Sequence, residues 1–146
     1  NISEVANELL PVYMEDAQAR NLRFHVHIEP DIVIQTNKDS FRQMLTILLD
    51  NALKYTPDDG YIRLSLARDG RHVLIIEENT CDPSLEPDSE RLFERFYRGD
   101  AARTQRKESS GYGIGLSAAR AICENFGGKM TAEYSSAESI RFTARF

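Results

Sequence analysis

The stretch KDSFRQMLTILLDNALKYTP, residues 38–57, carries the strongest helical signal in the chain. Its apolar residues recur at intervals of three and four, which places their side chains along one face of an α-helix. This apolar stripe is broad and contains Phe41, Met44, Leu45, Leu48, Leu49, Ala52 and Leu53. Because Pro57 lacks the N–H that a helix interior requires, we expect the helix to span residues 38–55.

Two strands follow this helix and are joined by a tight turn. The segments YIRLSLA (61–67) and HVLIIEEN (72–79) are rich in the apolar and β-branched residues that are typical of strands. Asp69-Gly70 between them is the usual signal for a two-residue turn. The sequence therefore predicts a hairpin directly after the helix.

Three further elements are expected before the central helix. Residues 3–20 have the apolar spacing of a helix, although Pro11 would remove one internal hydrogen bond. LRFHVHIE (22–29) alternates apolar and polar residues, so it is predicted to be a strand with its two histidines on the outer face. IVIQT (32–36) is predicted to be its partner strand across the turn between them.

The C-terminal part of the chain continues this alternation of elements. Residues 81–111 are irregular except for a short apolar turn in RLFERFY (91–97). A helix is expected over residues 115–126, ended by Gly127 and Gly128 where a left-handed cap is common. KMTAEY (129–134) and SIRFTARF (139–146) are the last two predicted strands.

Helices that fall between antiparallel hairpins indicate one α+β domain over residues 1–146. We expect a two-layer α/β sandwich in which a mixed sheet has its helices packed on one face. A chain of 146 residues with 41% hydrophobic content is long enough to fold as a single unit.

Charge and composition exclude several classes of protein. The net charge is −5, and the one basic cluster, residues 95–107, is not the extended basic stripe of a nucleic-acid-binding domain. Cys81 and Cys123 lack the spacing of a metal site, which fits a reducing, cytoplasmic setting. The sequence has neither an apolar run of about 20 residues nor a signal peptide.

Two polar residues of the central helix form a candidate magnesium and phosphate site. Asn51 and Lys54 are three residues apart and share a helix face, next to Tyr55. An amide oxygen suits Mg²⁺, which takes few protein ligands when it is bound with nucleotide phosphates. The alternative interpretation of this pair is an ordinary solvated helix end.

Three glycines precede the last helix at alternate positions, Gly111, Gly113 and Gly115. Glycine costs backbone entropy on folding, so such a cluster needs a reason. One reason is a tight loop whose amides approach a phosphate at the positive end of the following helix. A flexible turn is the other.

Three motifs in order resemble those of the ATP-binding catalytic domain of bacterial sensor histidine kinases, in the GHKL ATPase superfamily. LLDNALKYTP (48–57), RLFERFYRGD (91–100) and GYGIGLSAARAICENFGGKM (111–130) are similar to the N, F and G2 boxes. The resemblance implies a protein that binds Mg-ATP and transfers the γ-phosphate to a histidine on a separate dimerisation domain. A response regulator would act downstream.

The resemblance also implies roles for individual residues. Asn51 matches the Mg²⁺ ligand and Lys54 matches a phosphate contact. Arg98 matches an arginine of an ATP lid over about residues 81–111. Phe93 and Phe96 would pack at the base of this lid. The implied nucleotide-binding residues are Asn51, Lys54, Tyr55, Asn79, Arg98, Gly111, Tyr112, Gly113, Ile114, Gly115 and Leu116.

The G1 box departs from the family pattern, in which an aspartate receives the adenine amino group. Here Asn79 replaces the aspartate, and Cys81 and Pro83 replace two glycines. An asparagine can accept from the amino group and donate to a ring nitrogen. A register shifted by one residue would place Glu78 there instead. The altered box leaves a nucleotide-binding pseudokinase as an alternative.

A second departure concerns the reaction. Ile47 lies where the hydrolysing relatives carry a water-activating glutamate, which favours a kinase because a neutral imidazole is already a competent nucleophile. None of His25, His27 and His72 opens an acceptor-type helical sequence. We therefore expect a monomeric catalytic domain of a larger, membrane-anchored and homodimeric kinase, with an anti-sigma-factor serine kinase as a further alternative.

Overall fold

The computed structural model describes residues 1–81, 92–93 and 112–146. Three of its helices are α1 (Ile2–Ala19), α2 (Lys38–Tyr55) and α4 (Tyr112–Asn125). The strands are β1 (Arg23–Ile28), β2 (Tyr61–Asp69), β3 (His72–Thr80), β4 (Lys129–Ser136) and β5 (Ser139–Arg145).

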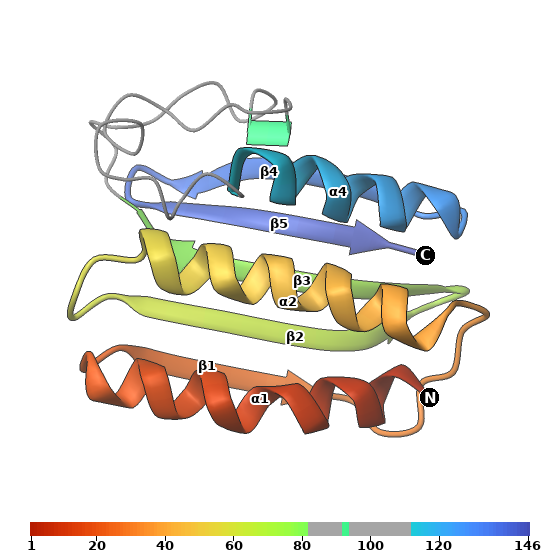
Figure 1. Cartoon of the computed structure of the whole chain (residues 1–146), viewed down its shortest axis with the longest axis horizontal. Helices are drawn as coiled ribbons and strands as arrows, with labels where there is room; N and C mark the ends of the chain where they lie inside the picture. Colours follow the sequence, from red (N-terminus) through yellow and green to blue (C-terminus); the bar gives the residue numbers. More distant parts are fainter. Residues whose placement is uncertain (82–91, 94–111) are drawn as a thin grey trace.

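The strands form one mixed sheet in the order β1-β2-β3-β5-β4. β1 pairs with β2 in parallel, and every other neighbouring pair is antiparallel. Figure 1 shows α1, α2 and α4 side by side on one face of this sheet. The predicted α+β sandwich, with helices on one face of a mixed sheet, is therefore confirmed.

One predicted strand is wrong. Residues 32–36 form no strand, and β1 lies beside β2, with Arg23 opposite Tyr61 and Ile28 opposite Leu66. The backbone of Ile32 is bound elsewhere, because its N–H donates to Ser3 Oγ at 3.0 Å and its carbonyl accepts from the N–H of Ile2 at 2.9 Å. The segment therefore anchors the start of α1, and its apolar alternation reflects the burial of Ile32 there.

The central helix α2 begins and packs as its sequence predicts. Asn37 caps it through a 3.0 Å hydrogen bond from the N–H of Ser40 to its side-chain oxygen, which satisfies one of the amides that a helix start leaves free. Its apolar stripe is buried in the main core, with Phe41, Met44, Leu45, Leu48 and Leu49 each at most 1% exposed. This packing fixes the position of the polar residues near its C-terminus.

The last helix begins earlier than the sequence suggested. α4 starts at Tyr112 and not at Gly115, so Gly113 and Gly115 are helical. Gly127 follows the helix with φ = 83°, which confirms the predicted left-handed cap. In the described part of the chain, no helix is both long and apolar enough to span a bilayer.

Candidate functional site

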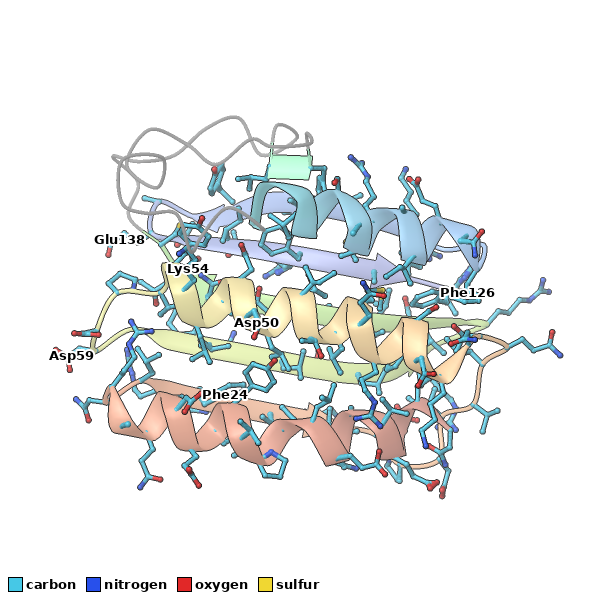
Figure 2. The ribbon with its side chains drawn as sticks, viewed as in Figure 1. Phe24, Asp50, Lys54, Asp59, Phe126 and Glu138 are labelled. Carbon is cyan, nitrogen blue, oxygen red and sulfur yellow. The ribbon has the colours of Figure 1, made fainter. Side chains whose placement is uncertain are left out.

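The C-terminal end of α2 and the C-terminal end of β3 meet at one end of the molecule. The N–H of Tyr61 donates to Thr80 Oγ1 at 2.9 Å, which ties the connection after α2 to the last residue of β3. Gly60 lies so close to this junction that a β-carbon there would be 3.1 Å from Thr80 Cβ. Figure 2 shows Lys54 and Asp59 at this end of the molecule. The predicted N-box and G1-box residues therefore lie near one another.

On α2, the site residues occupy the last two turns. Asn51 is buried, with 7% of its surface exposed, and Lys54 and Tyr55 are partly exposed. The Lys54 ammonium lies 5.8 Å from the centre of the Tyr55 ring. In the described ranges, no group of three or more His, Cys, Asp or Glu residues could hold a metal ion.

Asn79 lies on the face of β3 that is covered by the helices. Successive side chains of a strand point to opposite faces, and Asn79 shares its face with Val73 and Ile75, which belong to the main core. It is 1% exposed. Its Nδ2 donates to the carbonyl oxygen of Thr80 at 2.9 Å, whereas its buried Oδ1 has no hydrogen-bond partner.

Glu78 lies on the opposite face of the sheet. Its carboxylate accepts from Arg63 at 3.0 Å and from Arg141 at 3.1 Å. Burial alone would raise its pKa, but hydrogen bonds from Ser135 and Arg141 and the charges of both arginines outweigh burial and lower the pKa below its usual value. The shifted register, with Glu78 in the position of the family aspartate, conflicts with this placement.

Glu77 is a residue of this region that the sequence interpretation missed. It is 0% exposed, it shares the inner face of β3 with Asn79, and neither carboxyl oxygen has a hydrogen-bond partner. Full burial raises its pKa well above the usual value, and the charge of Glu78 adds to this effect. The alternation along β3 could have indicated this residue, because Glu77 follows Val73 and Ile75 at every second position and therefore points inward.

The start of α4 lies against α2. A β-carbon on Gly115 would meet Ile47 Cγ2 at 3.5 Å, which is an ordinary contact distance. Leu116 is buried in the core at 6% exposure. Gly115 and α2 are therefore adjacent, as a shared phosphate site requires.

Part of the predicted lid is anchored in the core. Phe93 is buried and packs edge-on against Phe142, with 6.0 Å between ring centroids. The guanidinium of Arg120 stacks over the Phe93 ring at 4.2 Å. Most of the predicted lid, residues 82–91 and 94–111, lies outside the described residues, and this part includes Pro83, Phe96, Arg98 and Gly111. The side chains of Tyr112 and Ile114 are not described either.

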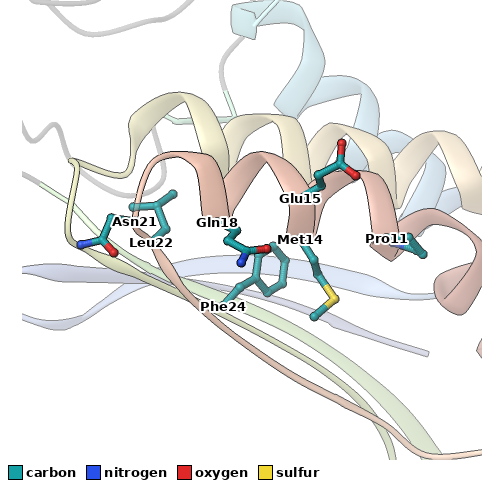
Figure 3. A pocket seen from close by; sticks show the side chains of 7 residues that line it. All are labelled: Pro11, Met14, Glu15, Gln18, Asn21, Leu22 and Phe24. Carbon is teal, nitrogen blue, oxygen red and sulfur yellow. The ribbon is translucent and has the colours of Figure 1, made fainter.

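A shallow cavity of about 430 Å³ lies elsewhere, between α1 and β1. Pro11, Met14, Gln18 and Phe24 are among its lining residues (Figure 3). It contains none of the predicted site residues, and its one acid, Glu15, faces no second ionisable group in its lining. The convergence of α2, β3 and α4 remains the candidate site.

The chain is similar to known sensor proteins. A family model described as "Histidine kinase-, DNA gyrase B-, and HSP90-like ATPase" matches residues 36–146. The chain is 40% identical to the sensor protein CiaH of Streptococcus pneumoniae over 113 residues. The aligned part covers 77% of this chain and 24% of CiaH. The chain is 36% identical over 115 residues, 79% of this chain, to the probable sensor protein PcoS of Escherichia coli, again over 24% of that protein. The chain spans about a quarter of the length of these relatives.

Solved structures show the same fold. The nucleotide-free catalytic domain of histidine kinase ThkA superposes with a TM-score of 0.81 at 24% identity, covering 100% of this chain and 91% of that one. The mycobacterial sensor histidine kinase MprB gives a TM-score of 0.78 at 24% identity, covering 99% and 94%. The chain therefore belongs to the histidine kinase-, DNA gyrase B- and HSP90-like ATPase family, and its fold is that of sensor histidine kinase catalytic domains.

Proposed function

We propose that this domain binds Mg-ATP where α2, β3 and α4 converge and presents the γ-phosphate to a histidine on a separate dimerisation domain of the same kinase. The observation that carries the proposal is the proximity of three features: Asn51 and Lys54 on α2, the unpartnered Asn79 Oδ1 on β3, and Gly115 on α4. They supply an oxygen ligand, a cation, a hydrogen-bond acceptor and a glycine-bearing helix start.

Each group suits one part of the nucleotide. Asn51 would ligate Mg²⁺ through its amide oxygen, and Lys54 would contact the phosphates as a point charge. Magnesium, when bound, neutralises phosphate charge. The first turn of α4 offers the backbone amides and positive dipole end that favour anions. Tyr55 would lie beside the nucleotide, and Arg98 would complete the site from the lid.

The base would be recognised at the end of β3. Asn79 Oδ1 is buried and lacks a partner, and a buried acceptor without a partner costs free energy. The exocyclic amino group of adenine is a donor that would satisfy it. We therefore assign Asn79 to adenine recognition, in the position that an aspartate holds in the family pattern.

The reaction that fits this site is phosphoryl transfer and not hydrolysis. Ile47, one turn before Asn51, cannot activate water, because its side chain has no basic group. A histidine imidazole would attack the γ-phosphorus directly, with departure of ADP, and the phosphoryl group would pass to a response regulator. Histidine kinases do pair with response regulators, as in the solved ThkA complex with TrrA. We further propose that the whole kinase is homodimeric and membrane-anchored.

Calorimetric titration with a non-hydrolysable ATP analogue, with and without magnesium, tests the proposal. We expect magnesium-dependent binding that Lys54→Ala weakens, whereas Lys129→Ala, at an exposed position at the start of β4, leaves it unchanged. A folded protein that shows no magnesium-dependent heat at millimolar nucleotide would refute the proposal.

Transfer is tested with γ-labelled ATP. The chain alone should neither label itself nor hydrolyse ATP appreciably, and addition of the cognate acceptor-histidine domain should give a labelled acceptor. Binding without transfer to that acceptor would identify a pseudokinase. Robust hydrolysis by the chain alone would contradict the proposed role of Ile47.

A further inference from the structure

The inner face of β3 carries a carboxyl group that the fold itself does not explain. Glu77 is 0% exposed, and both of its oxygens lack hydrogen-bond partners. Its neighbours across the sheet are Leu64 on β2 and Phe142 on β5, both buried and apolar. A buried polar group without a partner is costly, and native structures rarely keep one without a functional reason.

The amide of Asn79 is already committed in part. One of its two Nδ2 hydrogens donates to the carbonyl oxygen of Thr80, whereas Oδ1 has no partner. Adenine presents a donor, its amino group, next to ring nitrogens that accept. With Asn79 Oδ1 accepting from the amino group, a second side chain on the same strand face can supply a donor to the adjacent ring nitrogen.

Glu77 is placed to be that donor. It lies two residues before Asn79 on the same face of the strand, so the two α-carbons are about 6.5 Å apart. A carboxyl group that is fully buried without a counter-charge favours its neutral form, which carries one O–H donor and one acceptor oxygen. A neutral carboxyl beside an amide acceptor thus offers the hydrogen-bonding pattern that the amino edge of adenine complements.

We propose that Glu77 is a specificity-determining residue of the nucleotide site. Its neutral carboxyl group donates a hydrogen bond to the adenine ring nitrogen that lies next to the amino group, and Asn79 Oδ1 accepts a hydrogen bond from that amino group. This inference rests on the proposed function, because it assumes that the base of ATP binds at the end of β3. It assigns adenine recognition to a pair of residues, where the family pattern has one aspartate.

A purely structural role for Glu77 makes a different prediction. Replacing a buried, unpartnered acid with an apolar residue of similar size generally stabilises a fold or leaves it unchanged. Glu77→Met should therefore raise the melting temperature in either case. Only the specificity role predicts that the same variant loses nucleotide affinity.

The experiment compares ATP-analogue affinity and melting temperature in three variants at one magnesium concentration. We expect Glu77→Met to weaken binding about five-fold or more while the protein melts at a higher temperature. Glu77→Gln keeps a donor and an acceptor, so its affinity should stay near that of the parent. Glu78→Gln, one residue further on but on the outer face, is the matched control and should bind like the parent.

Two analogues identify the ring nitrogen. In these ATP analogues, carbon replaces either N1 or N7, so each lacks one acceptor of the base. The parent should bind one of the two analogues more weakly than it binds ATP. Glu77→Met should bind that same analogue as well as it binds ATP. The inference is overturned if Glu77→Met binds like the parent, if Glu77→Gln loses as much as Glu77→Met, or if neither analogue distinguishes parent from variant. A parent that binds no nucleotide would instead refute the proposed function.

Discussion

Arg20 Nη2 donates a 2.6 Å hydrogen bond to the carbonyl oxygen of Thr56, the residue that caps the C-terminus of α2. The same guanidinium also donates to the carbonyl oxygen of Leu53 and to Asp58. The last carbonyls of a helix have no partner within it, and a cation there also interacts favourably with the helix dipole. The end of α1 thus holds the end of α2 that carries Asn51.

Replacement of Arg20 by alanine should therefore destabilise the domain. The variant leaves the Leu53 and Thr56 carbonyls without this donor, and we expect a loss of about 1–3 kcal/mol in the free energy of unfolding by urea denaturation. Arg42→Ala is the matched control, because Arg42 forms an exposed ion pair with Glu8, which is worth about 1 kcal/mol or less. Equal losses in both variants would contradict a capping role for Arg20.

Gly60 is predicted to be intolerant of a side chain. A β-carbon there would lie 2.9 Å from the Pro57 carbonyl oxygen, 2.9 Å from Thr56 Cγ2 and 3.1 Å from Thr80 Cβ. Overpacking of this kind typically costs about 1–3 kcal/mol, so Gly60→Ala should lower the melting temperature clearly. A melting temperature equal to that of the parent would show that the junction between α2 and β3 adjusts freely.

Gly115→Ala should separate stability from nucleotide binding. The added β-carbon would make only an ordinary 3.5 Å contact with Ile47, and alanine is favoured over glycine inside a helix by about 1 kcal/mol. We therefore expect the variant to be at least as stable as the parent in urea. A close approach of phosphate to the helix start requires the glycine, so we expect Gly115→Ala to bind the ATP analogue more weakly than the parent does. Unchanged affinity would assign Gly115 to backbone flexibility alone.

Periodicity and turn residues in the sequence were sufficient to predict the sandwich. The stripe of α2, the Asp69-Gly70 turn and the alternation of the last two strands are local signals, and each element lies where they indicated. The failure at residues 32–36 has a nonlocal cause. Their alternation resembles a strand, but Ile32 is bound to the start of α1 and β1 pairs with a strand from beyond α2. Single-segment patterns do not report such pairing.

For a similar reason, the candidate site could be predicted only in part from the sequence. Motif spacing predicted the residues on α2, but the two acids of β3 could not be distinguished without knowing the face of each. Strand register places Glu78 between two arginines on the outer face and leaves Glu77 inside without a partner. The inward position of Glu77 follows from counting two residues forward from Ile75, whereas its lack of partners depends on three strands and the helix layer together.

The buried carboxyl predicts how stability depends on pH. Folding raises the pKa of Glu77 above its ordinary value of 4.5, so above that pH the folded protein holds a proton that the unfolded chain has released. By linkage, the contribution of Glu77 to stability declines as pH rises from about 4.5 towards the folded-state pKa.

Glu77→Gln removes this dependence. The difference in free energy of unfolding, variant minus parent, should increase as pH rises above 4.5, the ordinary pKa of a glutamate, by at most about 1.4 kcal/mol per pH unit. Urea denaturation at several pH values measures it. A difference that stays constant over this range would show that the Glu77 carboxyl titrates normally in the folded protein.

The last prediction compares two adjacent residues on opposite faces of β3. Asn79→Ala removes the buried Oδ1 that we assign to the adenine amino group, and loss of such a hydrogen bond should weaken ATP-analogue binding by about 1–3 kcal/mol, roughly five-fold to more than a hundred-fold. An inosine nucleotide carries a carbonyl in place of the amino group, so it should bind the parent less well and should be affected less by Asn79→Ala.

Glu78→Ala is the control that the structure provides for this comparison. It removes the carboxylate that accepts hydrogen bonds from both Arg63 and Arg141 on the outer face, so it should lower stability while leaving affinity unchanged in the folded protein. The opposite result, with Glu78→Ala weakening binding and Asn79→Ala having no effect, would mean that the base reaches the outer face of the sheet. Because α2, which carries Asn51 and Lys54, lies on the inner face, that result would also remove these two residues from the nucleotide site.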